Sequence, residues 1–198
     1  MIVFLDLETT GLNERDGSIL ELAAIVVDDD LRELARFETL VRPLAGEAGA
    51  LSPFILDMHS KSGLLADIFE DKANTVLRDT VPRRHQAEQL ALAWLDEVAP
   101  AQAGTKPPPL GGSSVHFDRA WLKEHMPLLE KRFAYRNIDV STFLECSNRW
   151  TPELTRSGMD PAAPKTPHRA MPDIEFSLER LRAYKRELFD PRAAKQVA

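Results

Sequence analysis

The stretch that most constrains this chain is residues 3–12, VFLDLETTGL. Its opening residues are apolar, with β-branched and aromatic side chains prominent, which predicts a buried strand. Asp6 and Glu8 interrupt this run two residues apart, and a strand places both carboxylates on the same face. Neighbouring like charges raise each other's pKa unless a cation neutralises them. We therefore interpret the pair as the beginning of a metal site.

The alternative is that Asp6 and Glu8 lie on the solvated face of an edge strand, since charged residues are mostly exposed. The apolar residues before Asp6 weigh against a solvated strand. The positions of the other acidic residues in the chain are needed to distinguish the two interpretations.

Length and composition favour one domain of ordinary type. The chain has 198 residues, of which 43% are hydrophobic and 28% are charged. No apolar run approaches the roughly 20 residues that span a bilayer, so we expect no membrane partner. Asp6 and Glu8 break the apolar run that a signal peptide would need, so we expect a cytoplasmic protein. The single cysteine, Cys146, excludes an intrachain disulfide and a cysteine-based zinc site, and leaves a partly buried thiol or a catalytic one.

The net charge of −6 bears on possible partners. A protein that grips a long nucleic acid usually carries a basic face, because neutralising phosphates supplies most of the affinity. The charge therefore argues against long duplex as the main partner. It remains compatible with a short oligonucleotide, for which a few contacts and a metal suffice.

The apolar periodicity predicts strands first and then mixed helices and strands, the order of an α/β layer structure. The expected strands cover residues 2–5, 19–28, 31–42, 110–113 and 136–140, the first three antiparallel. The expected helices cover short pieces at 51–58 and 62–71, then 82–98, one from Asp118 to a stop or kink at Pro127, 141–150 with Ser141 as N-cap, and one from near Pro172 to Leu188. Residues 99–109 and 151–167 are expected loops, residues 1–190 one domain, and residues 191–198 a frayed tail.

Further residues with chemical potential occur at element boundaries. Asp118 follows GGSSVHF at a strand-to-helix junction, His168 and Asp173 lie five apart at the start of the last helix, and Asp139 ends a strand. Taken alone, each has a simpler explanation: an acid in a first helical turn is stabilised by the helix dipole, and a lone loop histidine is usually exposed. Asp139 is most simply structural, holding a neighbouring loop.

Taken together, these residues resemble the DEDDh exonucleases, which have four acidic residues and a histidine on a ribonuclease-H-like fold. That family has D-x-E on its first strand, an aspartate at the start of a middle helix, and H-x4-D near the last helix. Here these are Asp6 and Glu8, Asp118, and His168 with Asp173. The resemblance implies a three-layer α/β fold, with a mixed five-stranded sheet flanked by helices, in a single exonuclease domain.

Within this group the chain resembles the oligoribonucleases over nearly its full length. The matching stretches are FLDLETTGL, HSKSGL, GSSVHFDRAWLKEHMPLLE, FAYRNIDVSTF, RWTPEL and HRAMPDI. The resemblance implies a 3′–5′ exoribonuclease that hydrolyses short RNA, especially 5′-phosphorylated dinucleotides, to nucleoside 5′-monophosphates. Such an enzyme contributes to RNA degradation.

The resemblance also assigns roles to the five residues. Two ions of Mg²⁺ or Mn²⁺, which prefer hard oxygen ligands, would activate the attacking water and stabilise the leaving oxygen. Asp6 would bridge both ions, Glu8 and Asp173 would hold the ion nearer the water, and Asp118 would hold the other. His168 would take the proton of the water, because the natural pKa of histidine lies near working pH.

Substrate contacts and a partner follow from the same resemblance. Leu12 and Phe54, with His59 nearby, would hold the 3′ bases. The 5′ phosphate would be capped, in part by a second subunit of a homodimer, by polar and aromatic groups drawn from Ser113, Tyr135, Arg136, Ser141 and Thr142.

Two alternatives stay open. The chain could be a broader 3′–5′ exonuclease acting on single-stranded DNA or longer RNA, which the ETTGL motif favours slightly. It could instead be a non-catalytic nucleic-acid-binding module that kept the fold. The complete set of five residues argues against the module, since binding alone does not need His168.

The chain also departs from the oligoribonuclease pattern. Thr9-Thr10 stands where the family usually has Met-Thr, and Pro172 stands where it tends to have an acidic residue. Leu144 replaces a frequent lysine, which puts one phosphate contact in doubt, and Phe54 replaces a larger tryptophan. The Pro-rich segment 105–109 is peculiar to this chain. These departures indicate a divergent member.

Overall fold

A computed structural model of the chain describes residues 1–43, 51–69, 81–101, 104–152 and 168–189. It contains the predicted mixed five-stranded sheet, in the order β3-β2-β1-β4-β5. Strand β1 pairs antiparallel with β2, as does β2 with β3, whereas β1 with β4 and β4 with β5 are parallel pairs. The strand bounds are β1 (Ile2–Thr9), β2 (Ile19–Val27), β3 (Glu33–Leu40), β4 (Leu110–Gly112) and β5 (Asn137–Asp139).

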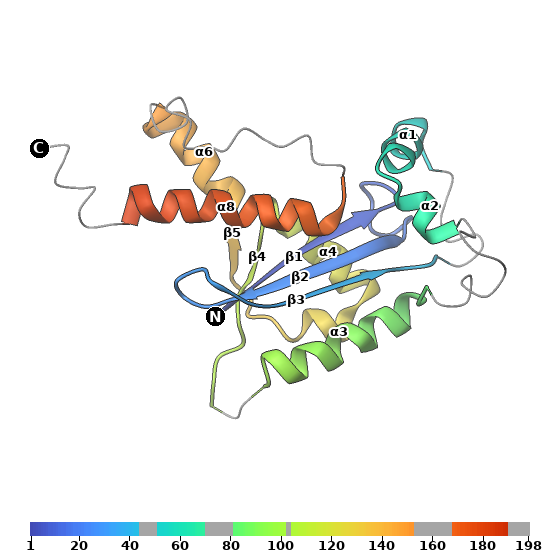
Figure 1. Cartoon of the computed structure of the whole chain (residues 1–198), viewed down its shortest axis with the longest axis horizontal. Helices are drawn as coiled ribbons and strands as arrows, with labels where there is room; N and C mark the ends of the chain where they lie inside the picture. The colour runs from blue at the N-terminus through green and yellow to red at the C-terminus, as the bar shows by residue number, and fades with distance from the viewer. Residues whose placement is uncertain (44–50, 70–80, 102–103, 153–167, 190–198) are drawn as a thin grey trace, which may run out of the picture.

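Helices cover both faces of the sheet, which confirms the three-layer α/β fold. Figure 1 shows α6 and α8 on one side of the sheet and α3 on the other, with α1 and α2 beside the end of β1. No helix among the described residues is long and apolar enough to cross a membrane. The helix bounds are α1 (Pro53–Lys61), α2 (Leu64–Phe69), α3 (Arg84–Val98), α4 (His116–His125), α5 (Pro127–Glu130), α6 (Val140–Trp150) and α8 (Ala170–Phe189).

The alternation of side chains along β1 separates two cores. Val3, Leu5 and Leu7 belong to the core shared with α3, α4 and α5. Ile2 and Phe4 belong to the core shared with α6 and α8. Asp6 and Glu8 continue the second series, so they face the side of the sheet that α8 covers. Strand β1 pairs with β2 along its whole length and with β4 at Val3 and Phe4, and Glu8 is buried, so the solvated edge-strand interpretation is wrong.

Several predicted element boundaries need correction. Asp139, and not Ser141, is the N-cap of α6: its Oδ1 accepts a hydrogen bond from the Ser141 backbone N–H at 3.0 Å. Helix α4 begins at His116, which places Asp118 in its first turn, and α8 begins at Ala170. The third strand begins at Glu33, because Leu31 has a left-handed backbone conformation (φ 63°) in the preceding turn.

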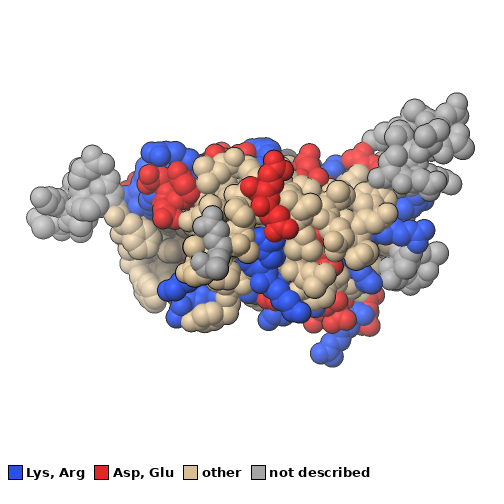
Figure 2. All heavy atoms as spheres, turned by 90° about the horizontal axis from the view of Figure 1, so that it is seen from below, with Lys and Arg blue, Asp and Glu red and all other residues tan. Residues whose placement is uncertain are grey.

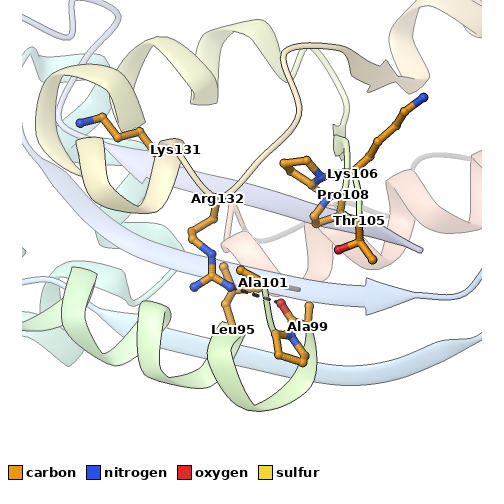
Figure 3. A pocket seen from close by; sticks show the side chains of 10 residues that line it. Leu95, Ala99, Ala101, Thr105, Lys106, Pro108, Lys131 and Arg132 are labelled. Carbon is orange, nitrogen blue, oxygen red and sulfur yellow. Dashed lines mark hydrogen bonds between the residues drawn. The ribbon is translucent and has the colours of Figure 1, made fainter. Parts of the chain in front are cut away.

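The Pro-rich segment lies away from the carboxylates. With the end of α3 and α5 it lines a cavity of about 140 Å³, where Arg132 hydrogen-bonds to the Ala99 carbonyl (Figure 3). This segment leads into the first residue of β4, whereas Asp6 and Glu8 lie at the last residues of the parallel strand β1. Residues 153–167 of the predicted loop and the predicted tail 191–198 lie outside the described residues.

The turn after β1 depends on a glycine. A Cβ atom at Gly17 would lie 2.5 Å from Cη2 of the buried Trp121 and 2.8 Å from Oγ1 of Thr10. We expect Gly17→Ala to lower the free energy of unfolding by about 1–3 kcal/mol, because overpacking forces neighbours to move. Gly11→Ala is the control, since a Cβ there meets nothing within 4 Å. Urea denaturation of both variants would contradict this packing if their losses were equal.

Candidate active site

Three carboxylates meet at the end of β1. Ligand oxygens of Asp6, Glu8 and Asp173 all lie within 4.8 Å of one another. Asp6 and Glu8 come from one face of β1, and Asp173 comes from the first turn of α8, which lies over that face (Figure 1). The structure therefore brings together residues separated by more than 160 positions in the sequence, as the motif predicted.

Asp118 approaches the same end of β1 from α4, and its side chain is buried. Its Oδ1 accepts a hydrogen bond from the Leu7 backbone N–H at 3.1 Å. This bond ties the first turn of α4 to the strand between Asp6 and Glu8. Asp118 is not one of the three residues whose oxygens share the 4.8 Å group, but its charge acts on Asp6.

The carboxylates are under electrostatic strain. Burial, followed by the charges of Asp118, Glu8 and Asp173, raises the pKa of Asp6 well above its usual range. Burial and the charges of Asp173, Glu21 and Asp118 raise the pKa of Glu8 to about 8. Burial also raises the pKa of Asp118 to about 7. Converging oxygen ligands that resist ionisation without a positive charge fit a hard divalent cation.

His168 lies two residues before the start of α8 and five before Asp173, and is exposed. Its backbone is left-handed (φ 50°), which is uncommon for a residue other than glycine. Burial lowers the pKa of the His59 ring, and the charge of His168 acts in the same direction. The predicted base is thus open to solvent and lies five residues before Asp173 of the carboxylate group.

Sequence reasoning missed an ion-paired cluster beside the site. Glu21 of β2 lies directly across from Glu8 and is buried. Arg169, next to His168, donates to both carboxylate oxygens of Glu21 and to Asp67 of α2. One signal for this cluster was available in the sequence: Glu21 is an isolated charge within the apolar run of residues 19–27.

The residues predicted to hold the 3′ bases divide into two groups. Leu12 and Phe54 are 83% and 73% exposed, so both apolar side chains are available to a ligand. His59 is fully buried: one ring nitrogen hydrogen-bonds to the Thr9 carbonyl at 2.9 Å, and Nδ1 lies 3.8 Å from Oε2 of Glu8. In this structure His59 therefore cannot touch a base, and it instead packs behind Glu8.

The predicted phosphate-capping residues are also divided. Ser113 hydrogen-bonds to Ser177 of α8, whereas its neighbour Ser114, which was not predicted, donates from its backbone N–H to Asp139 and to Oγ of Ser141. These bonds confirm that Asp139 holds the neighbouring loop. Ser114, Ser141 and Thr142 line a pocket of about 470 Å³ that reaches Trp150 at the end of α6.

Tyr135 and Arg136 are exposed and lie outside that pocket. The Arg136 guanidinium stacks over the Tyr135 ring, with Cζ 4.5 Å from the ring centroid. Tyr135 lines a separate hollow with residues of α4, among them Arg119 and Lys123. Within one chain, therefore, Tyr135 does not join the serine-lined pocket.

Charge is mixed on the molecular surface. On the face shown in Figure 2, lysines and arginines are interspersed with acidic residues. The described residues of that face therefore form no continuous basic track for a long nucleic acid, in agreement with the acidic net charge.

Known proteins resemble this chain in sequence over almost its whole length. An oligoribonuclease of Neisseria meningitidis serogroup C is 32% identical over 198 residues, covering 98% of this chain and 97% of the relative. An oligoribonuclease of Chromobacterium violaceum is 36% identical, covering 93% of each. The chain belongs to the oligoribonuclease family. A family model described as "Exonuclease" also matches residues 3–68.

Solved structures of other proteins share the fold of this oligoribonuclease family member. The Mg²⁺- and Mn²⁺-bound form of S. pombe Pop2p superimposes with a TM-score of 0.64 at 11% identity, covering 96% of this chain and 84% of Pop2p. The zinc-bound form of the E. coli ExoI–ssDNA complex gives 0.63 at 13% identity, covering 99% and 42%. Family membership makes the chain a nuclease, and the ribonuclease-H-like architecture is confirmed.

The raised pKa values predict how metal changes stability with pH. The folded-state pKa of Glu8 is about 8 against 4.5 for a free glutamate, so the folded chain keeps a proton that the unfolded chain releases. This contribution to stability is complete below pH 4.5 and is lost as the pH rises through 8. We expect the increase in Tm on adding Mg²⁺ or Mn²⁺ to EDTA-treated protein to be larger at pH 8 than at pH 5, because cations compete with protons.

Calorimetry at both pH values, with and without metal, measures this effect. Glu8→Gln is the matched control, because its amide cannot ionise and should respond less to metal at pH 8. A metal-induced increase in Tm that is equal at both pH values would contradict a metal site at these carboxylates.

Proposed function

We propose that this 3′–5′ exoribonuclease hydrolyses short RNA, preferentially 5′-phosphorylated dinucleotides, to nucleoside 5′-monophosphates with two Mg²⁺ or Mn²⁺ ions. The observation that carries the proposal is the convergence of Asp6, Glu8 and Asp173, with Asp118 beside them, at the end of one buried strand. Such a concentration of buried acid is costly in a protein without a bound cation.

The side chains have distinct duties in this proposal. Bound divalent ions would supply Lewis-acid stabilisation of the phosphate and activation of a water. Asp6 would contribute to holding both ions, because it belongs to the group with Glu8 and Asp173 and also interacts with Asp118. Glu8 and Asp173 would help to hold one ion, and Asp118 would help to hold the other.

His168 is the proposed general base. It is exposed just before α8, the helix that supplies Asp173, so an incoming water can reach its ring, and an imidazole is the side chain most often used for such proton transfer. A nucleic-acid-binding module without catalysis has no use for this residue, whereas hydrolysis needs an acceptor for the water's proton.

Exposed apolar groups support recognition of a short substrate. Leu12 and Phe54 can hold the 3′ bases, because stacking on aromatic and apolar surfaces is a general way to bind single strands. The pocket of Ser114, Ser141 and Thr142 offers hydroxyl groups for a 5′ phosphate. We propose that Tyr135, which lies outside this pocket in one chain, closes the site of a second copy in a homodimer.

The length preference has a direct test. Turnover of 5′-phosphorylated RNA of two, five and twenty nucleotides is measured with Mg²⁺ and with Mn²⁺, alongside single-stranded DNA of the same lengths. We expect a steep preference for two nucleotides, because the phosphate cap blocks longer strands. Equal kcat/KM at all lengths would instead support a broad exonuclease, and no turnover with either metal would support a binding module.

The role of Asp6 is tested by Asp6→Ala. We expect no detectable turnover, with the helical circular dichroism retained and the stability of metal-free protein at pH 8 unchanged or higher, because the variant removes a repelling charge. Asp29→Asn is the control: this exposed carboxylate lies in the β2–β3 turn, at the opposite end of β1. Loss of the helical signal in Asp6→Ala would show that Asp6 is structural.

A mixing experiment tests the contribution of a second copy. Asp6→Ala and Tyr135→Ala should each be inactive on dinucleotides, yet mixed dimers contain one site with intact Asp6 and a partner's intact Tyr135. Equal mixing should therefore restore roughly a quarter of the wild-type activity. A monomer in sedimentation at micromolar concentration, or no recovery on mixing, would contradict this arrangement.

A further inference from the structure

We propose that Arg169 is a positioning residue that holds His168 in place through a clamp on Glu21. The inference rests on the proposed function, since it takes His168 as the base. Arg169 is neither one of the three grouped carboxylates nor a residue that lines the serine-lined pocket, although its charge acts on Glu8 and lowers the pKa of that carboxyl.

The clamp consists of charge-assisted hydrogen bonds. Nε and a terminal nitrogen of Arg169 donate to Oε1 of Glu21 at 3.0 and 2.7 Å, and the other terminal nitrogen donates to Oδ2 of Asp67 at 2.9 Å. The backbone N–H of Ala170 donates to Oε2 of Glu21 at 2.9 Å. Glu21 thus holds both the side chain after His168 and the first backbone group of α8.

Burial makes this contact directional. The Glu21 side chain is 6% exposed and that of Arg169 is 24% exposed. Ion pairs partly removed from water are screened less, and the planar guanidinium matches a carboxylate in a fixed geometry that an ammonium cannot reproduce. The pair therefore fixes an orientation in addition to neutralising a charge.

His168 needs such support because its backbone is left-handed, at φ 50°. A conformation of this kind is unfavourable for a residue other than glycine and persists where the surroundings impose it. On the C-terminal side of His168, Arg169 and the Ala170 N–H are both tied to Glu21. The clamp thereby sets the direction in which the His168 ring leaves the chain.

The anchor lies in the strand beside the carboxylates. Glu21 of β2 lies opposite Glu8 of β1 in the sheet. A clamp on Glu21 therefore fixes the position of His168 relative to the strand that carries Asp6 and Glu8. The second contact, to Asp67, also fixes Arg169 relative to α2. Arg169 thus sets the distance between the base and the carboxylate group through two rigid elements.

The first test is Arg169→Met, which keeps the length and the apolar stem of the side chain but loses every hydrogen bond. We expect kcat on a 5′-phosphorylated dinucleotide to fall about 10- to 100-fold, with KM and the Mn²⁺ affinity changed less than about threefold. Arg169→Lys should recover only part of the loss. Asp67→Asn, which weakens only the outer contact, should cost much less.

A double-mutant cycle asks whether Arg169 acts through His168. Single-turnover rates are measured with excess enzyme for Arg169→Met, His168→Ala and the double variant. We expect Arg169→Met to cost little further once His168 is absent. An equal loss in both backgrounds would overturn the clamp, whereas an unchanged rate in His168→Ala would overturn the proposed function of His168 instead.

An NMR measurement tests the clamp even where the residual turnover rates of the variants are too low to measure. The chain has five histidines, and the imidazole NMR signals of labelled protein can be assigned to His168 by their loss in His168→Ala. We expect the His168 signals to shift or broaden in Arg169→Met while those of the distant His85 stay unchanged. An unaltered His168 signal would overturn the proposal.

The loss of the ion-pair partner of Glu21 in Arg169→Met needs its own control. Arg169→Met leaves a buried carboxylate unpaired, which can destabilise the fold without any effect on His168. The double variant Glu21→Gln with Arg169→Met removes that charge, so we expect Tm to recover while kcat stays low. Recovery of kcat together with Tm would show that Arg169 is merely structural.

Discussion

The repulsion among the carboxylates at the end of β1 is the constraint on which the rest of the structure depends. Asp6 and Glu8 can stay close together only because the apolar residues before them fix β1 in the middle of the sheet. Burial on both faces then removes the solvent that would otherwise screen the charges, so the pKa values rise. The packing that stabilises the strand thus creates the demand for a cation.

The topology explains why four carboxylates reach one place. Strand β1 runs parallel to β4, so the chain leaving β4 enters α4 at the same edge of the sheet where β1 ends. At that edge Asp118 accepts a hydrogen bond from the Leu7 N–H. Helix α8 covers the other face of the sheet, and its first turn contains Asp173. Each of these acids belongs to a strand or helix that is held in place by its own buried apolar residues.

Much of this was predictable from the sequence because the signals are local. The apolar run with D-x-E gave β1, and the helical stripe of Ile174, Leu178 and Leu181 gave α8. Local patterns could not decide the N-cap of α6, because Asp139 and Ser141 are both good capping residues and only the backbone geometry selects Asp139. Nor could they show that His59 is buried, since that depends on how α1 packs beside β1.

Glu21 shows most clearly what a single sequence does not reveal. It is a fifth acid beside the group, directly across from Glu8, and its charge raises the pKa of both Asp6 and Glu8. Its partner Arg169 is 148 residues away, so no local pattern distinguishes it from a ligand. The arginine is the physical difference: the two oxygens of Glu21 accept hydrogen bonds from the Arg169 guanidinium and the Ala170 N–H, whereas no arginine bonds to Asp6 or Glu8 among the described contacts.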